Sequence, residues 1–233
     1  LQLTNKFESF KKLGKQNGFL FYVNAWNTSK IDPVTGFVNL FNTRYENVEK
    51  AKIFFSNFES IKFNHVKNYF EFAVNNYSKF NAKSEETKQN WIICTYGSRI
   101  KTVRNSKKNN SWDSEEINLT EKFIKFFEKY KIDVQSGRCL KDLICMQTQK
   151  EFFEELLYLF KLTLQMRNSK TNTKEDYLIS PVADANGKFY DSREYEKIEK
   201  PLLPKNTDAN NTYNIARKRI MIIDKIKNIS RCF

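Results

Sequence analysis

The stretch from Thr148 to Arg167, TQKEFFEELLYLFKLTLQMR, carries the strongest structural signal in the sequence. Its apolar side chains recur every three or four residues, which is the spacing of one face of an α-helix. Thr148 and Glu151 form a capping-box pattern, in which each side chain bonds an amide that the first helical turn leaves unpaired. We therefore expect the longest helix of the protein here. Its expected buried face consists of Phe152, Phe153, Leu156, Leu159, Phe160, Thr163 and Leu164.

Further helices and strands are predicted on both sides of this helix. Helical spacing of apolar residues indicates helices, whereas short alternating or continuous apolar runs bounded by Gly, Pro or Asn indicate strands. The two kinds follow one another without regular alternation, so we expect an α+β fold. Residues 104–113 are polar and indicate a loop, and residues 168–205 show no long periodicity. The expected helices are 5–16, 46–58, 118–131, 138–146 and 210–228, and the expected strands are 18–23, 37–41, 61–63, 69–74 and 91–96.

The composition excludes some classes of protein and favours one class of partner. Aromatic residues make up 15% of the 233 residues, too many for a disordered chain. No apolar run approaches the roughly 20 residues that cross a bilayer, so we expect no membrane protein. The 40 Lys and Arg against 27 Asp and Glu give a formal charge of +13, which attracts polyanions such as nucleic acid. A bias of composition toward Lys explains this charge equally well. Cations beside aromatic residues, such as Arg99 and Lys101 near Tyr96, fit nucleic-acid contacts and ordinary amphipathic strands alike.

Few side chains are suited to metal binding or nucleophilic catalysis. The cysteines are Cys94, Cys139, Cys145 and Cys232, none of them in a C-x-x-C pair, and the single histidine is His65. Zinc sites need clustered ligands, so we expect none here. A lone histidine also argues against Ser-His-Asp and Cys-His catalysis. Any catalysis is therefore expected to depend on carboxylates, a metal ion, or Arg and Lys side chains.

The sequence begins at Leu1 without an initiator Met and without the basic and apolar regions of a secretory signal. We therefore interpret the chain as a piece of a longer protein. Since no secretory signal is in view, reduced thiols and a cytoplasmic location are the default expectation.

Six short motifs occur in order along the chain. They are QLTNKFESF (2–10), TSKIDPVTGFVN (28–39), LQMRNS (164–169), DYLISPV (176–182), FYDSR (189–193) and DAN followed by YNIA (208–216). In this order they closely resemble the C-terminal part of the type V-A CRISPR effector, a single-chain RNA-guided DNA endonuclease. The resemblance spans essentially the whole chain, and its strength comes from the order of the motifs rather than from any one of them.

The resemblance implies a division into domains. Residues 1–22 would end the second segment of an RNase H-like RuvC domain, 23–205 would form the Nuc domain, and 206–233 would belong to the third RuvC segment. In this family the RuvC site holds carboxylates from separate segments around Mg²⁺, and only the third-segment aspartate can lie in this sequence. Carboxylates suit this chemistry because they bind hard cations, which activate water and stabilise the leaving oxygen.

Asp208 matches that aspartate and is the predicted catalytic metal ligand, although its local sequence alone would favour a helix cap. A second Asp-Ala-Asn, at Asp184, is followed by Gly187 and by no helix. Because Asn-Gly is typical of a type I′ hairpin turn, we interpret Asp184 as a turn residue. The family usually has Gly and Ala where this chain has Asn211 and Thr212, and a polar side chain there could crowd the site.

Arg167 is the second predicted catalytic residue. The resemblance implies that the Arg of the LQMRNS motif lies beside the RuvC cleft and assists DNA cleavage, since a guanidinium binds phosphate bidentately. The alternative is an Arg that bonds the last carbonyls of a helix. Asp176 matches a family position next to this Arg and is the third predicted catalytic residue, although an Arg–Asp pair could simply hold the loop. Ser29, Lys30 and Asp32 also match the family, with no assigned role beyond shaping their loop.

Two functions are consistent with these residues. The first is part of a Mg²⁺-dependent endodeoxyribonuclease of CRISPR antiviral defence, a monomeric prokaryotic effector whose partners are guide RNA and both DNA strands. The second is a non-catalytic nucleic-acid-binding module derived from such a nuclease. Because only one of the family's metal-binding carboxylates can lie in this sequence, the chain alone is predicted to be inactive.

Overall fold

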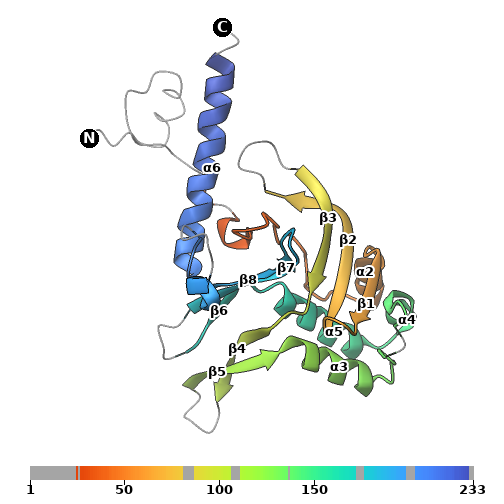
Figure 1. Ribbon diagram of the computed structural model, residues 1–233. Coiled ribbons are helices and arrows are strands. Elements are labelled where there is room, and N and C mark those ends of the chain that lie inside the picture. The colour runs from red at the N-terminus through yellow and green to blue at the C-terminus, as the bar shows by residue number, and fades with distance from the viewer. Residues whose placement is uncertain are drawn as a thin grey trace.

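The computed structural model describes residues 25, 27–80, 87–105, 111–135, 137–171, 176–197 and 203–230. These residues form helices and antiparallel strands, so the predicted α+β fold is confirmed (Figure 1). The helix expected over 5–16 and the strand expected over 18–23 lie outside the described residues. A search of the described helices finds none with the length and hydropathy of a membrane span.

An antiparallel sheet organises the fold. Along it lie β1 (Ser60–Asn64), β2 (Tyr69–Lys79), β3 (Thr87–Cys94), β7 (Asp176–Ala183) and β6 (Arg167–Ser169), and β8 (Phe189–Asp191) also pairs with β7. The strands predicted over 61–63 and 69–74 are confirmed, and they pair as an antiparallel hairpin with Ile61 opposite Phe72. β3 meets β7 only at Ile93 and Val182. The β6–β8 end is therefore a distinct part of the sheet, and the candidate site residues lie on and beside it.

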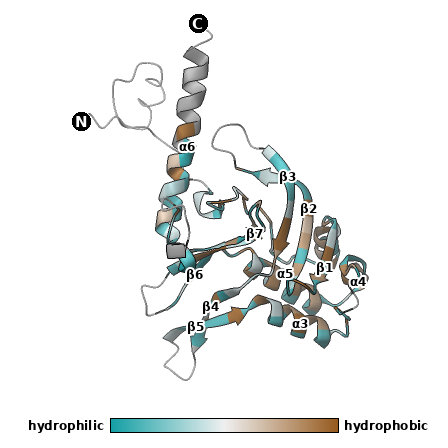
Figure 2. Cartoon of the chain, viewed as in Figure 1, coloured by the Kyte–Doolittle hydropathy of each residue, from teal (hydrophilic) through white to brown (hydrophobic). Residues whose placement is uncertain are grey.

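Aromatic side chains form the core between the sheet and its helices. α2 (Val48–Ser56), α3 (Leu119–Lys129) and α5 (Lys150–Thr163) bury their apolar faces there, and α4 (Lys141–Met146) packs beside α2. The ring of Phe160 lies 5.0 Å from Phe72 and 5.3 Å from Phe58, centroid to centroid. Figure 2 shows the hydrophobic colours concentrated in these helices and the strands beside them. Burial of each Phe side chain contributes about 1.5–3 kcal/mol to the stability of the fold. This core therefore stabilises the sheet to which β6 and β7 belong.

α5 is shorter than predicted. Its N-cap is Gln149, with no side-chain hydrogen bond, so the predicted capping box of Thr148 and Glu151 is wrong. The helix ends at Thr163, because the backbone that follows pairs with β7 and the side chain of Gln165 bonds β4 instead. Its predicted buried face is confirmed. The longest described helix is α6 (Thr207–Ser230), with 24 residues against 14 in α5.

The strand predicted over 37–41 is not formed. Phe37 and Val38 make only isolated bridges, to Lys79 and Ile31. Phe37 is fully buried, with its ring centroid 5.4 Å from that of Trp91. The apolar run therefore anchors an irregular segment in the core instead of joining the sheet.

The loop predicted over 104–113 is wrong at both of its ends. β4 (Ser98–Asn105) and β5 (Ser111–Asn118) form a two-stranded ribbon whose register continues to Asn105 and Ser111. Its polar sequence resembles that of a loop because a two-stranded ribbon away from the core leaves most of its side chains in solvent. In Figure 1 this ribbon extends away from the main sheet.

The turn between β7 and β8 confirms that Asp184 is a turn residue. Its carboxylate accepts hydrogen bonds from the amides of Asn186, at 2.8 Å, and Lys188, at 2.9 Å. A type I′ turn needs positive φ at both central residues, but Gly187 has a φ of 76° while Asn186 has no positive φ. The hairpin is thus confirmed, and its turn is of the kind that ends in a single left-handed glycine.

Candidate functional site

Arg167 begins β6, the short edge strand that follows α5. Its neighbours Met166 and Asn168 are 6% and 0% exposed, whereas Arg167 is exposed. Successive side chains along an extended backbone point to opposite sides, which explains this alternation. The LQMRNS motif therefore buries the residues on either side of the arginine and leaves the arginine outside.

Two amide side chains hold this segment against β4. Asn168 Oδ1 accepts from the amide of Ile100 at 2.9 Å, and Asn168 Nδ2 donates to the carbonyl of Met166 at 3.1 Å. Gln165 Nε2 donates to the carbonyl of Ile100 at 2.9 Å. Both backbone polar groups of Ile100 are thus engaged. The sequence assigned these amides no role, although their place on either side of Arg167 was an available signal.

The guanidinium of Arg167 makes no hydrogen bond or ion pair with any residue that the structure describes. It does not bond the last carbonyls of α5, the alternative that its sequence position allowed. Arg99 does this instead, because its Nη2 donates to the carbonyl of Thr163 at 3.1 Å. Arg99 is fully buried, and burial lowers its pKa to about 9. Arg167 therefore remains available for a ligand, since Arg99 performs the structural role.

Asp176 begins β7 and holds the start of α6. Its carboxylate accepts from the Thr207 hydroxyl at 2.9 Å and from the Thr207 amide at 3.4 Å. A carboxylate at a helix N-terminus is favoured by the helix dipole. The Arg167–Asp176 ion pair that the sequence left open is not formed between these two described residues.

Arg167 and Asp176 nevertheless lie on one face of the β6–β7 pair. In the register, Arg167 is opposite Leu178 and Ser169 is opposite Asp176. Residues two apart on a strand share a face, and such diagonal neighbours across a pair lie about 7–8 Å apart. Long side chains reach across this distance.

Asp208 lies in the first turn of α6 with its side chain exposed. The helix is capped by another residue, because the Oδ1 of Asn206 accepts from the amide of Ala209 at 2.9 Å. The capping role that its local sequence favoured is therefore taken by Asn206. Asp208 follows Thr207, so the contact of Asp176 with Thr207 also fixes where Asp208 emerges.

The two residues that depart from the family pattern differ in their surroundings. Thr212 is exposed, and its hydroxyl donates to the carbonyl of Asp208 at 3.0 Å. Asn211 is half-buried, and its Oδ1 is shielded from water without a hydrogen-bond partner among the described residues. Such an atom carries a desolvation cost of about 1–3 kcal/mol. Of the two residues, Asn211 is therefore the one with an unfavourable environment.

The loop that contains the TSKIDPVTGFVN motif holds the first turns of α6 through hydrogen bonds. Asn214 is fully buried, and its Nδ2 donates at 3.0 Å to each of the carbonyls of Thr28 and Ile31. Asn210 Nδ2 donates to the same Ile31 carbonyl at 3.4 Å. Residues four apart share one face of a helix, so this pair of asparagines was a detectable sequence signal. Thr28 lies in η1 (Thr28–Lys30).

Asp32 connects this loop to β7. Its Oδ1 accepts from the amides of Val34 and Thr35, at 2.9 and 2.7 Å, and its Oδ2 contacts the hydroxyl of Ser180. Asp32 is fully buried, and this burial raises its pKa. The hydroxyl of Ser180 also lies 2.8 Å from the carbonyl of Val182. A single hydroxyl proton cannot serve both acceptors at once, so the Ser180 hydroxyl is shared between the Asp32 carboxylate and the Val182 carbonyl.

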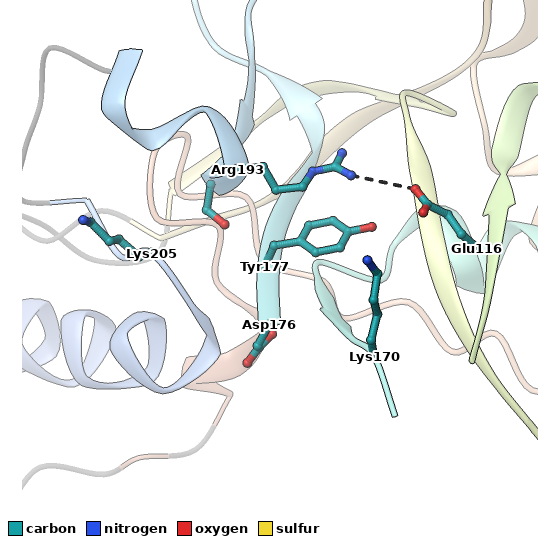
Figure 3. A pocket seen from close by; sticks show the side chains of 7 residues that line it. Glu116, Lys170, Asp176, Tyr177, Arg193 and Lys205 are labelled. Carbon is teal, nitrogen blue, oxygen red and sulfur yellow. Dashed lines mark ion pairs between the residues drawn. The ribbon is translucent and has the colours of Figure 1, made fainter. Parts of the chain in front are cut away.

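A hollow of about 430 Å³ opens beside Asp176 (Figure 3). Arg193, from η2 (Ser192–Lys197), crosses it: its guanidinium lies 4.2 Å from the Tyr177 ring centroid and bonds Asp191 at 2.6 Å. This hydrogen bond raises the pKa of Arg193. Cations and carboxylates are mixed around the hollow, so it has no strong preference for either sign of ligand. Its lining consists of Glu116, Lys170, Asp176, Tyr177, Ser192, Arg193 and Lys205.

Comparison with known families identifies most of this structure. A family model described as a nuclease domain, NUC, matches residues 31–194. The chain belongs to this family. Within this Nuc domain lie Arg167, Asp176 and the Asp32 loop, whereas Asp208 lies beyond the matched residues. The boundaries expected at 22 and 205 and the RuvC assignment of the flanking segments stay predictions.

The Mg²⁺ site expected at Asp208 is not formed by the described residues alone. Among them, no cluster of at least three His, Cys, Asp or Glu side chains could hold a metal ion. We therefore derive no catalytic step through a metal from the described Nuc residues. The role of Asp208 as one metal ligand remains a prediction from the resemblance.

Proposed function

We propose that this Nuc domain and the start of α6 belong to a type V-A CRISPR effector, an RNA-guided DNA endonuclease. The observation that carries the proposal is the exposed guanidinium of Arg167, which shares a face of the β6–β7 pair with Asp176. Asp176 in turn bonds Thr207, the residue before Asp208. The chain thus carries a phosphate-binding cation on β6 and an exposed carboxylate on α6, two elements that both contact β7.

The three predicted residues have different parts in this function. Arg167 binds a phosphate of the strand to be cut and stabilises the negative charge that develops there. Asp208 would be one of the carboxylates that hold Mg²⁺, an ion whose chemistry would be the activation of water and the stabilisation of the leaving oxygen. Asp176 acts as a positioning residue, because its carboxylate is already engaged by Thr207.

The partners of the complete effector would be a guide RNA and both strands of the target DNA. The formal charge of +13 supports attraction of these polyanions. The effector would act as a monomer in the prokaryotic cytoplasm, in antiviral defence. The chain by itself is expected not to cut DNA.

A second candidate is a binding module that has lost its chemistry. The observation in its favour is Asn211, whose buried Oδ1 lacks a partner among the described residues and lies three positions after Asp208. In this candidate, the unpaired oxygen of Asn211 disfavours the position of Asp208 that metal binding requires.

Variants of Asp208 and Asp184, each of which begins an Asp-Ala-Asn, distinguish between these two functions. We expect that, in the complete effector, Asp208→Ala abolishes Mg²⁺-dependent cleavage of a guide-matched DNA while guide-directed binding persists. Asp184→Ala is the matched control, because Asp184 also begins an Asp-Ala-Asn but serves the β7–β8 turn. It should cut at the parent rate. A parent effector that binds matched DNA without cutting would favour the binding module, and cleavage by the Asp208→Ala variant would refute the metal-ligand role.

A further inference from the structure

The β4–β5 hairpin presents an exposed aromatic side chain under a cation. Trp112 is 56% exposed and lies directly opposite Arg104 in the register. The guanidinium carbon of Arg104 is 5.4 Å from the Trp112 ring centroid, within the range of a cation–π contact. Arg104 has no ion pair with any described residue. The pair therefore combines a free positive charge with an accessible π-face.

The cations and aromatic ring that the sequence suggested for nucleic-acid contact have other roles. Arg99 is fully buried, and Lys101 Nζ lies 5.2 Å above the ring of Tyr158 in α5. Tyr96 stacks on Phe189 at a centroid distance of 4.2 Å. These contacts attach the base of the hairpin to the body of the domain. These contacts fit the ordinary strand packing that the sequence left open beside nucleic-acid contact, and the accessible pair lies further out on the same ribbon.

The surroundings of Trp112 distinguish between kinds of partner. Thr102 and Ser114 are the neighbours of the pair on the same face, because each is two residues away along its strand. A protein interface usually centres on a contiguous apolar patch, which a single aromatic ring among polar residues does not provide. An aromatic ring with an adjacent cation is instead the arrangement that stacks an unpaired base and contacts its phosphate.

We propose that Arg104 and Trp112 form a stacking site for an unpaired nucleotide of single-stranded DNA. The base stacks on the exposed indole and Arg104 pairs with the neighbouring phosphate. The choice of DNA rests on the proposed function, and the net charge of +13 favours any polyanionic strand. The site would hold the strand at a place away from Arg167, and it is independent of cleavage.

Tryptophan fluorescence of this chain provides the test. The chain has three Trp, and Trp26→Phe leaves Trp91, which is 5% exposed, and Trp112 as the emitters. Titration with oligothymidylate should quench the Trp112 emission. Trp112→Ala should remove this quenching and weaken binding about 5-fold to 100-fold, whereas Trp112→Phe should retain part of the affinity. Arg104→Ala should reduce the slope of log affinity against log salt by about one.

Thermal melting at the parent temperature would show that the Trp112 and Arg104 variants are folded, as their exposure leads us to expect. Equal oligothymidylate affinity of the parent and Trp112→Ala, or quenching that survives in Trp112→Ala, would overturn the site and leave the proposed nuclease function untouched. Quenching that rises with protein concentration without DNA would identify a second copy of the chain as the occupant and refute the proposal. Tighter Trp112-dependent binding of oligouridylate would refute its assignment to DNA.

Discussion

The carboxylate of Asp176 accepts hydrogen bonds from the hydroxyl and the amide of Thr207, at 2.9 and 3.4 Å. Asp176 belongs to the Nuc sheet, and Thr207 begins the helix that carries Asp208. Because β7 also pairs with β6, the strand of Arg167, this contact couples the positions of the two residues proposed to act on DNA.

Asp176→Ala should therefore loosen the start of α6. We expect faster amide hydrogen exchange in residues 207–212 and a loss of about 0.5–1.5 kcal/mol of stability for each hydrogen bond removed. Asp176→Asn keeps one acceptor and should lie between the parent and the Ala variant. Unchanged exchange in residues 207–212 of Asp176→Ala would show that the Asn206 cap and the Asn214 contacts suffice.

Arg167→Ala should separate function from stability. The side chain is exposed and makes no polar contact with described residues, so its removal should change the free energy of unfolding by less than about 0.5 kcal/mol. In the complete effector we expect a loss of cleavage rate of about 100-fold or more, with Arg167→Lys recovering only part of it, since Lys cannot bind phosphate bidentately. Arg138→Ala, which removes another exposed arginine, is the control and should behave as the parent. Cleavage at the parent rate by Arg167→Ala would contradict the proposed role.

Asn168→Ala, unlike Arg167→Ala, should lower the stability of the fold. It leaves the buried amide of Ile100 without an acceptor, for which we expect a loss of about 1–3 kcal/mol in urea unfolding. Cleavage measured below the new unfolding midpoint should also fall, because β6 would no longer be held against β4. Asn186→Ala in the exposed turn serves as the control for loss of an amide side chain and should have little effect.

Stability should depend on pH through Asp32. Burial raises its folded-state pKa above the ordinary value of 3.8, so the folded chain binds this proton more tightly than the unfolded chain. The stability that this provides is fully present below 3.8 and is lost as the pH rises through the folded-state pKa. Asp32→Asn keeps an acceptor for the Val34 and Thr35 amides without the ionisation.

Urea unfolding from about pH 4 to about pH 8 should show the free energy of unfolding of the parent falling relative to that of Asp32→Asn. Asp32→Ala should be less stable than both across the range, since it leaves the amides of Val34 and Thr35 without their acceptor. Parallel profiles for the parent and Asp32→Asn would show that Asp32 does not titrate in this interval.

Local signals in the sequence predicted local structure well. The helix expected over 118–131 is an example, since α3 runs from Leu119 to Lys129 and Asn118 Oδ1 accepts from the amide of Glu121 at its start, at 3.2 Å. The turn at Asp184 is another. Prediction failed where long-range contacts decide the backbone: the LQMR segment continues a helical pattern, yet partners in β4 and β7 draw it out of the helix.

The sequence singled out candidate residues but not the contacts that they make. Arg167, Asp176 and Asp208 were all singled out by motif, and the structure assigns Asp176 a contact with Thr207 in place of the Arg–Asp pair. The supporting amides of Gln165, Asn168 and Asn214 received no role from the sequence. Their partners lie between 65 and 186 residues away along the chain, so a local pattern can mark these amides but cannot identify the segments that they bond.

The sequence by itself determined the amphipathic helices, the main hairpins, the excess of positive charge and the motifs that place this chain in the Nuc family. The helices and hairpins can be predicted because the spacing of side chains over a few residues matches the repeat of a helix or a strand. Only the tertiary structure decided which arginine is structural and which is free, since Arg99 is buried against α5 while Arg167 is left outside. It also decided that Asp176 and the Asp32 loop hold α6. The reason is physical: burial and hydrogen-bond partners are properties of segments brought together by folding, and identical side chains acquire different chemistry from them.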